Sequence, residues 1–451
     1  MKKLSSSLIK SVLIIFLCFL LTSTGHLSWM YHLMEQTTAD MSYQISTVLG
    51  YALQAVGICV FMFLFRQKRV SPRAVFVVSL VVYAACLVPA VIGTSLIGTI
   101  IFGSLLSLFC GLIAGYYLYY LTRNAPDNYR AVAFGVGYSS ATVASWLISM
   151  IGDGAIYYGG GIIAVCLALT VLIIVIVFVI PSNEKEEPEQ KTKQPLQKLR
   201  TLMFMACGLV LLFSLVNNIG FSFSESEVQS GLHPEFSRVF YSVGLLTAGF
   251  VTDKNRKYGA VCALAALAIP FIVLALKGER LSLTVFWALG YLAFGFYSVY
   301  RVILFSDIAK ERDMLWLSGA GLMIGRVGDA LGSEIYAVFS NNKTILVIAA
   351  GVLFVAAVFL FIKLFQSLYI PAADSQKSEQ EIFARFAARH DLSGREREVL
   401  RLLLEEKTNK EISDVISVSE STVKFHVHNL LSKTGCKTRN DLKNNYYTNR
   451  I

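Results

Sequence analysis

The chain has 451 residues, of which 55% are hydrophobic and 16% charged, and its mean hydropathy is +0.59. This composition excludes a soluble globular protein, because a soluble chain of this size needs far more polar surface. The net charge of +10 does not by itself indicate nucleic-acid binding. The tail from Asp374 onward is nearly balanced, with about fourteen Lys and Arg against about twelve Asp and Glu, so the excess lies mainly in loops between apolar segments.

Apolar runs long enough to cross a bilayer, roughly eighteen to twenty-five residues each, recur over the first part of the chain. We predict about twelve membrane spans in a multi-pass protein embedded in a lipid bilayer. The first run follows Lys2 and Lys3 and has a signal peptide as its alternative. The predicted spans are Leu8–Ser23, Gln44–Phe65, Ala74–Ile92, Leu96–Leu121, Ala131–Ile151, Gly160–Ile180, Leu202–Phe221, Phe236–Val251, Ala260–Leu276, Leu281–Phe305, Leu315–Phe339 and Ile345–Tyr369.

The charges of the connecting loops predict the orientation of this bundle. If the N-terminus lies inside, the loops that face the cytoplasm carry about nineteen basic residues, against about four in the opposite loops. An even number of spans then returns the C-terminus to the cytoplasm. The cytoplasmic set includes Arg66, Lys68, Arg69, Arg73, Arg123, Arg130, Lys254, Arg256, Lys257, Lys310 and Arg312.

A polar segment with proline at both ends, Pro181–Pro195, divides the membrane part into two halves of six spans. A glycine repeat supports this division, because three glycines of the first half recur at one constant offset in the second: Gly111, Gly135 and Gly137, then Gly295, Gly319 and Gly321. We therefore predict a first half at 1–180, a cytoplasmic linker at 181–200 and a second half at 201–370.

Six plus six spans with a central loop resemble the major facilitator superfamily, in which a substrate binds between the halves. The segment from Gly249 through Asp253 to Lys257 is similar to that superfamily's Gly-x-x-x-Asp-Arg-x-Gly-Arg-Arg loop, with the second Gly replaced. The equivalent loop after the second span, which begins at Phe65, has lost both the Gly and the Asp. The degraded copy argues against active transport without excluding it.

Ionisable residues inside the predicted spans are candidates for a ligand site, because charge in a membrane is costly to keep. Arg301 lies in the tenth span, and Arg326, Asp329 and Glu334 lie in the eleventh. The functional interpretation is a pocket for a small polar or charged ligand, with Arg301 as the anion anchor. The structural alternative is an internal ion pair, since Arg326 and Asp329 are three residues apart on one helix face.

The tail is predicted to hold a linker helix within 371–390, around Glu379–His390, and a small four-helix domain at 391–451. In that domain, Asn409–Ile416 is followed within a few residues by a second helix that Ser419 caps. Its buried stripe is Val423, Val427, Leu430 and Thr434. Two helices joined this tightly form a helix-turn-helix, in which the second helix enters the DNA major groove. A helical packing module with a solvated face is the alternative.

The segment Leu392–Leu442 resembles the DNA-binding domain of the LuxR/NarL family of bacterial transcription factors. The matching residues are Arg395, Glu396, Glu398, Val399 and Leu400, then Asn409, Lys410, Glu411 and Ile412, then Ser419, Thr422, Val423, Lys424 and His426, then Lys433, Gly435 and Arg439. The chain departs from the family pattern at Gly394, Glu406 and Thr434. Because Glu406 replaces a helix-ending glycine, we expect a residue other than glycine to adopt the left-handed turn there.

The resemblance implies which side chains meet double-stranded DNA. Lys424, Phe425 and His428 are expected to reach base edges, and Ser421 lies on the same face. Thr422, Asn429, Lys433 and Arg439 are expected at phosphate oxygens. His426 is expected to be either a DNA contact or a half-buried packing residue. Leu442 and Tyr446, in the last helix, are the expected contacts of a homodimer on paired half-sites.

Together these features predict an all-α chain: a polytopic membrane bundle followed by a small cytoplasmic helix-turn-helix domain, in the cytoplasmic membrane of a bacterium. We find no motif for a catalytic site, a cofactor or a metal, and so predict no enzyme. The leading hypothesis is a one-component transcriptional regulator that senses a small molecule of unknown identity through its membrane domain. The alternatives are a transporter with a regulatory DNA-binding tail and a DNA tether without a ligand.

Overall fold

The computed structural model describes residues 6–67, 70–151, 156–157, 160–180, 196–228, 237–269, 271, 280–339, 342–369 and 373–448. The chain forms two compact units, Met1–Phe365 and Gln366–Ile451. Regular structure in the described ranges is helical, which confirms the predicted all-α class. The predicted linker Pro181–Pro195 lies outside the described residues, as do 270 and 272–276 of the ninth predicted span.

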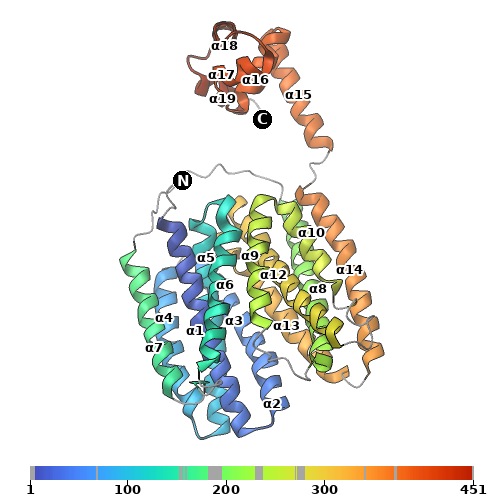
Figure 1. The fold of residues 1–451 in the computed structure, drawn as a ribbon. Coiled ribbons are helices and arrows are strands. Elements are labelled where there is room, and N and C mark those ends of the chain that lie inside the picture. The colour runs from blue at the N-terminus through green and yellow to red at the C-terminus, as the bar shows by residue number, and fades with distance from the viewer. Residues whose placement is uncertain are drawn as a thin grey trace. The chain divides into compact units, whose positions relative to one another are not determined.

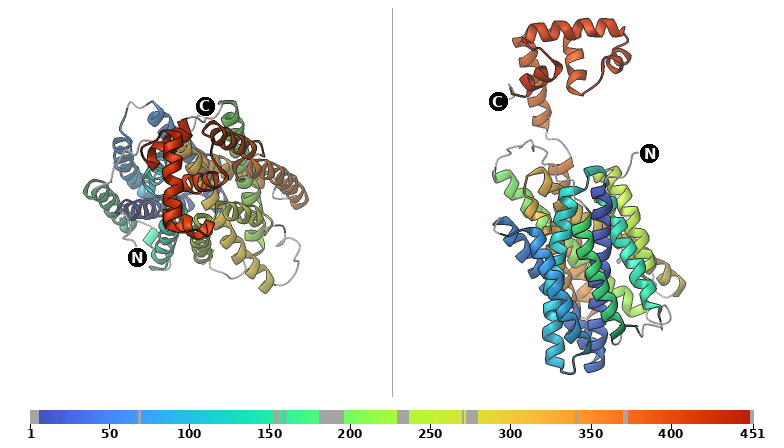
Figure 2. Two further views of the ribbon diagram at one scale, coloured as in Figure 1. Left: turned by 90° about the horizontal axis from the view of Figure 1, so that it is seen from above. Right: turned by 90° about the vertical axis from the view of Figure 1, so that its left-hand side faces the viewer.

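The helices of the membrane unit run side by side along a common direction (Figure 1 and Figure 2). The first residues of α1 and the last residues of α14 lie at the same end (Figure 1). The helices of the first half are α1 (Ser6–Gln36), α2 (Ala39–Gln44), α3 (Gly50–Arg66), α4 (Pro72–Ile92), α5 (Leu96–Asn124), α6 (Arg130–Ser149) and α7 (Gly160–Val179). Those of the second half are α8 (Leu196–Val228), α9 (Ser237–Lys254), α10 (Arg256–Ala266), α12 (Arg280–Glu311), α13 (Ala320–Phe339) and α14 (Lys343–Tyr369).

Nine helices in the described residues are long and apolar enough to cross a membrane. The eighth, ninth and eleventh predicted spans fall on α9, α10 and α13, which do not meet that criterion, so the total of twelve remains a prediction. Helix α13 fails the criterion because it contains three charged residues, Arg326, Asp329 and Glu334. The first predicted span ends too early, since α1 continues past Ser23 to Gln36 and packs into the bundle.

Glycines let paired helices approach closely in both halves. A Cβ atom at Gly111 of α5 would lie 2.1 Å from the carbonyl oxygen of Gln54 in α3. In the second half, a Cβ at Gly295 of α12 would lie 2.3 Å from the carbonyl carbon of Gly244 in α9. Both distances are too short for any larger residue. Gly111 and Gly295 are equivalent in the predicted repeat, so the repeat marks the same helix crossing in each half.

The two halves meet along α6 with α9 and along α3 with α13. The α6–α9 contact ends in an ionic cluster, where the Asp253 carboxylate accepts bonds from the backbone N–H groups of Ala131 (3.0 Å) and Val132 (2.6 Å). Arg256 bonds Asp253 at 2.6 Å and Asp307 at 2.7 Å. The cluster also holds Asp127, Arg130 and Lys310. It fastens the start of α6 to the second half, because a carboxylate is favourable at a helix N-terminus.

The tail unit contains α15 (Ala373–Arg389), α16 (Gly394–Leu404), α17 (Asn409–Ile416), α18 (Glu420–Thr434) and α19 (Arg439–Thr448). Capping boxes begin α16 at Ser393 with Glu396, and α17 at Thr408 with Glu411. Such boxes satisfy backbone N–H groups that a helix start leaves free. Glu406 itself takes the left-handed conformation after α16, with φ of 65°, as expected from the missing glycine.

Candidate functional site

Helix α18, the predicted recognition helix, has one buried and one exposed side. Its N-cap, Ser419, accepts the Thr422 N–H at 3.1 Å, and Gly435 ends the helix with φ of 68°. Gly435 suits this position because left-handed backbone costs glycine little. The buried residues are Val423, Val427, Leu430 and Thr434, which confirms the predicted stripe.

The opposite face of α18 presents side chains that the domain's core does not use. Lys424 and Phe425 are 63% and 61% exposed, and His428 and Ser421 are also exposed. An ion pair of 3.0 Å joins Lys424 to Glu420, one turn earlier. Such an exposed pair is weak, so the lysine can exchange it for another partner. Half-buried positions are taken by Asn429 and by His426.

Two of the predicted phosphate contacts already bind inside the domain. The Lys433 ammonium donates to Glu396 Oε2 at 2.7 Å and to the Asp391 carbonyl at 2.8 Å. Arg439 donates to the Asn409 side chain. These bonds tie the ends of α18 and α19 to the preceding helices, so Lys433 and Arg439 have structural roles that sequence reasoning did not foresee. Their contact with DNA stays a prediction, as does that of Thr422, whose hydroxyl lies 2.7 Å from Ser419 Oγ.

The environment of Glu396 changes its acidity. Burial of the carboxyl acts to raise its pKa, but the bonds from Lys433 and from Ser393 outweigh burial, so the pKa lies below its ordinary value. Glu396 is therefore ionised at neutral pH and holds α16 against α18. Glu411 behaves similarly, since bonds from the backbone and hydroxyl of Thr408 lower its pKa.

The predicted dimer contacts lie in the core of the tail domain and not on its surface. Leu442 is 1% exposed and Tyr446 is 5% exposed, and both belong to the core of their own domain. Tyr446 packs edge-on against Phe386 of α15 at a centroid distance of 5.1 Å. Because these side chains are covered within one copy, neither offers a surface to a second copy. Tyr447, the next residue, is 45% exposed.

Helix α15 is part of this core and more than a linker. Phe386 and Ala387 are buried in the tail's core cluster, and the Arg401 guanidinium lies over the Phe383 ring at 5.2 Å. From the sequence, this segment is predicted only as a connection between domains. The signal was present in the spacing of Ile382, Phe383, Phe386 and Ala387, which places four apolar side chains on one helix face.

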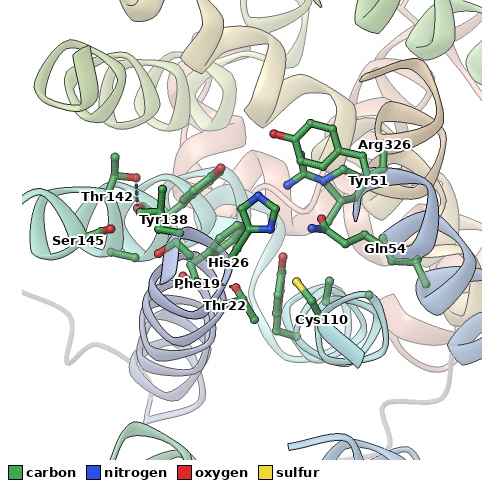
Figure 3. A pocket seen from close by; sticks show the side chains of 18 of the residues that line it. Phe19, Thr22, His26, Tyr51, Gln54, Cys110, Tyr138, Thr142, Ser145 and Arg326 are labelled. Atoms are coloured by element: carbon green, nitrogen blue, oxygen red, sulfur yellow. Dashed lines mark hydrogen bonds between the residues drawn. The ribbon is translucent and has the colours of Figure 1, made fainter. Parts of the chain in front are cut away.

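The membrane unit contains a cavity of about 330 Å³ between its halves. The first half contributes residues of α1, α3, α5 and α6, and the second half contributes residues of α9 and α13. Figure 3 shows the His26 ring in the middle of this space, with the Gln54 amide and the Arg326 guanidinium pointing toward it. The cavity volume is at the lower end of the roughly 300–1,000 Å³ typical of small-molecule sites.

Of the four predicted ligand residues, Arg326 lines the cavity. Arg301 and Asp329 lie behind it at 3% and 9% side-chain exposure and are joined to each other at 3.3 Å. Glu334 is on an exposed part of α13. His26, Gln54 and Tyr138 also line the cavity and are not among the residues predicted from sequence, although a polar side chain within an apolar run was the available signal for His26 and Gln54.

A bundle of paired halves with a central cavity and a helix-turn-helix unit define a membrane protein joined to a DNA-binding domain. The sequence model of the family described as "Bacterial regulatory proteins, luxR family" matches residues 390–443, and that of the Major Facilitator Superfamily matches residues 12–233. The chain belongs to the luxR family of bacterial regulatory proteins through this C-terminal domain.

Two relatives match the tail. The spore germination protein GerE of Bacillus subtilis (strain 168) is 44% identical over 54 residues, which are 12% of this chain and 73% of that protein. The response regulatory protein YgeK of Escherichia coli (strain K12) is 37% identical over 54 residues, which are 12% of this chain and 37% of that protein. The likeness to each is therefore confined to the DNA-binding domain.

The membrane unit is similar to a solved transporter. The crystal structure of the E. coli fucose:proton symporter FucP matches with a TM-score of 0.57 and 14% identity, over 79% of this chain and 99% of that chain. At this identity the likeness shows the fold alone. The membrane domain thus has the architecture of the Major Facilitator Superfamily, as the sequence predicted.

Proposed function

We propose that the chain is a membrane-embedded transcriptional regulator that senses a small molecule through its bundle and binds DNA through α18. The observation that carries the proposal is the exposed face of Lys424, Phe425 and His428 on a luxR-type recognition helix. An aromatic ring exposed on a small domain lowers its solubility. Contact of the Phe425 ring with a thymine methyl in the major groove would explain why this ring is exposed.

The same proposal places the protein in the cytoplasmic membrane of a bacterium, with the tail in the cytoplasm. Polar residues of three predicted cytoplasmic loops, represented by Arg130, Arg256 and Lys310, meet in one cluster at one end of the bundle. This arrangement supports the orientation taken from loop charge. The ligand acts by binding two packings of the bundle with different affinity, since equal affinity would shift nothing.

Binding as a homodimer to paired half-sites is also part of the proposal. The dimer contact has to be formed by exposed residues of the tail, because Leu442 and Tyr446 are buried within one copy.

The direct test is a gel shift with the purified full-length chain on DNA from upstream of its own gene. Lys424→Ala should weaken specific binding roughly tenfold or more, because each good base contact contributes about 1–3 kcal/mol of discrimination. Arg395→Ala is the matched control: it also removes one exposed positive charge, but from α16, outside the helix pair. Equal affinities for the Lys424 variant and the unchanged protein would refute the assignment of α18.

A transporter with a regulatory tail is the second candidate, and the likeness to the whole length of a symporter favours it. Against it stands the second-span loop after Phe65, which lacks the Gly and Asp of the transporter pattern. The candidate predicts that vesicles with a chain truncated before residue 372 still accumulate a solute. A regulator instead loses its effect on transcription with the same truncation, whether or not any solute moves.

A further inference from the structure

Two buried arginines of the membrane unit share one carboxylate. Arg301 and Arg326 each place a terminal guanidinium nitrogen near Asp329 Oδ2, at 3.3 and 3.4 Å. The other oxygen, Oδ1, accepts the Ser214 hydroxyl at 3.1 Å. Both ion pairs are longer than the 2.7–2.9 Å usual for charge-assisted bonds. Two positive charges therefore face one negative charge, and one positive charge has no counter-ion within 4 Å among the described residues.

Arg326 is the arginine that carries this excess charge into the cavity. Arg301 is held away from the cavity by a bond to the Tyr297 hydroxyl at 3.1 Å and by Asp329. The Arg326 guanidinium lies over the Tyr51 ring at 4.6 Å and lines the cavity. Its Nε has no hydrogen-bond partner in the described part of the chain. An unpaired buried donor is costly, so an acceptor from outside would be favoured there.

A second unsatisfied nitrogen belongs to the same space. His26 lies opposite Arg326 in the cavity, and its buried Nδ1 has no partner among the described residues (Figure 3). No Asp or Glu is present among the cavity-lining residues of the described ranges. The site thus presents nitrogen atoms that can bind an anion, and it presents no carboxylate that could bind a cation. Protonated amines are therefore disfavoured as ligands.

Five aromatic side chains also line the cavity: Phe19, Tyr51, Tyr117, Tyr138 and Tyr241. Phe19 and Tyr138 stack with centroids 3.7 Å apart, and Tyr241 meets Tyr138 edge-on at 5.5 Å. A flat apolar group can pack against the faces and edges of these rings that other rings leave open to the cavity, through stacking and area burial. The remaining polar side chains, such as Thr22 and Gln54, offer neutral hydrogen bonds.

We propose that the cavity binds a small aromatic monocarboxylate, with its carboxylate between Arg326 and His26 and its ring against Phe19 and Tyr138. The inference rests on the proposed sensing function and specifies its ligand class. It also replaces Arg301 by Arg326 as the anion anchor. One added negative charge balances the two arginines and Asp329, so the bound state is the one in which the buried charges are neutralised.

The test measures binding to the detergent-purified full-length chain by thermal shift and calorimetry. The probes are benzoate and phenylacetate, and their controls are benzamide, benzylamine and acetate, which alter the charge or remove the ring. Benzoate or phenylacetate should raise the melting temperature at millimolar concentration while the controls do not. Equal stabilisation by benzamide, or none by either aromatic carboxylate, would overturn the proposal.

The variant Arg326→Gln should weaken carboxylate binding roughly tenfold or more, since a charge-assisted bond is lost. The variant also removes the excess positive charge, so its unliganded form should melt no lower than the unchanged protein. That melting temperature is the control for correct folding of the variant. Glu334→Gln, on the exposed part of α13, should leave binding unchanged. If Arg326→Gln folds and binds benzoate as tightly as the unchanged chain, the anchor is wrong.

The outcome for the ligand is separable from the outcome for the regulator. A gel shift that depends on Lys424, without carboxylate binding, refutes the ligand class and leaves the DNA-binding function. Carboxylate binding without any specific gel shift refutes the regulator and leaves the ligand class.

Discussion

Replacement of Glu396 by Gln tests the bond that joins α16 to α18. The carboxylate accepts the Ser393 N–H at 2.7 Å and the Lys433 ammonium at 2.7 Å, and its side chain is 5% exposed. Gln keeps an acceptor for the N–H but loses the charge. A bond to a charged group contributes about 1.5–3 kcal/mol and a neutral one about 0.5–1.5. Because Lys433 is 38% exposed, we discount the difference for solvent screening and expect a loss of about 0.5–1 kcal/mol.

For a domain of this size, such a loss lowers Tm by roughly 2–8 °C. The assay is thermal unfolding of residues 372–451, followed by circular dichroism at neutral pH and at about pH 3. Because the folded pKa of Glu396 lies below its unfolded value, its contribution is present above the unfolded pKa of about 4.3 and disappears as pH falls through the folded pKa. The difference between the two proteins should therefore shrink in acid.

Glu398→Gln is the matched control, because Glu398 lies in the same helix, is 48% exposed and pairs with Arg395 across one turn. It should change stability by less than about 0.5 kcal/mol. Equal melting temperatures for the two variants at neutral pH would show that the Glu396 carboxylate does not join α16 to α18, and so would a difference that persists undiminished in acid.

Two further predictions concern the backbone and the ionic cluster. Ser417→Gly should stabilise the tail by up to about 1 kcal/mol in denaturant unfolding, because Ser417 ends α17 with φ of 53°; Ser417→Ala, which keeps the left-handed strain, should not. Asp253→Asn should lower the unfolding temperature of the detergent-purified chain by several degrees, because it breaks the bonds to α6 and Arg256, whereas Lys254→Gln at the same end of α9 should not. An unchanged transition for Asp253→Asn would show that the cluster does not hold the two halves together.

The tail was predictable from sequence because its signals are local. Ser393, Thr408 and Ser419 each precede a helix and cap it, and the buried stripe of α18 follows helical spacing. What failed there depends on tertiary contact. Leu442 and Tyr446 match positions expected at a dimer interface, but α15 supplies Phe386 to cover Tyr446 within the same copy.

The membrane cavity was harder to predict because its residues are distant in sequence. His26 and Arg326 are brought together only when α1 and α13 enclose the same space. The sequence indicated that charge in α13 matters, but it could not show that Arg301 is covered by Tyr297 while Arg326 is open to the cavity. The choice between them depends on packing, which hydropathy does not report.

The contacts between the two halves differ in chemistry at equivalent places. Where α6 meets α9, Asp253, Arg256 and Asp307 form a charged network. Near the α3–α13 contact, the end of α3 instead places Arg66 over the Trp316 ring at 5.0 Å. A second cation–π pair crosses the same contact, where Arg326 of α13 lies over the Tyr51 ring of α3 at 4.6 Å. A carboxylate bound to Arg326 would compete with this pair and with Asp329 for the guanidinium. The ligand would therefore act directly on the α3–α13 contact between the two halves.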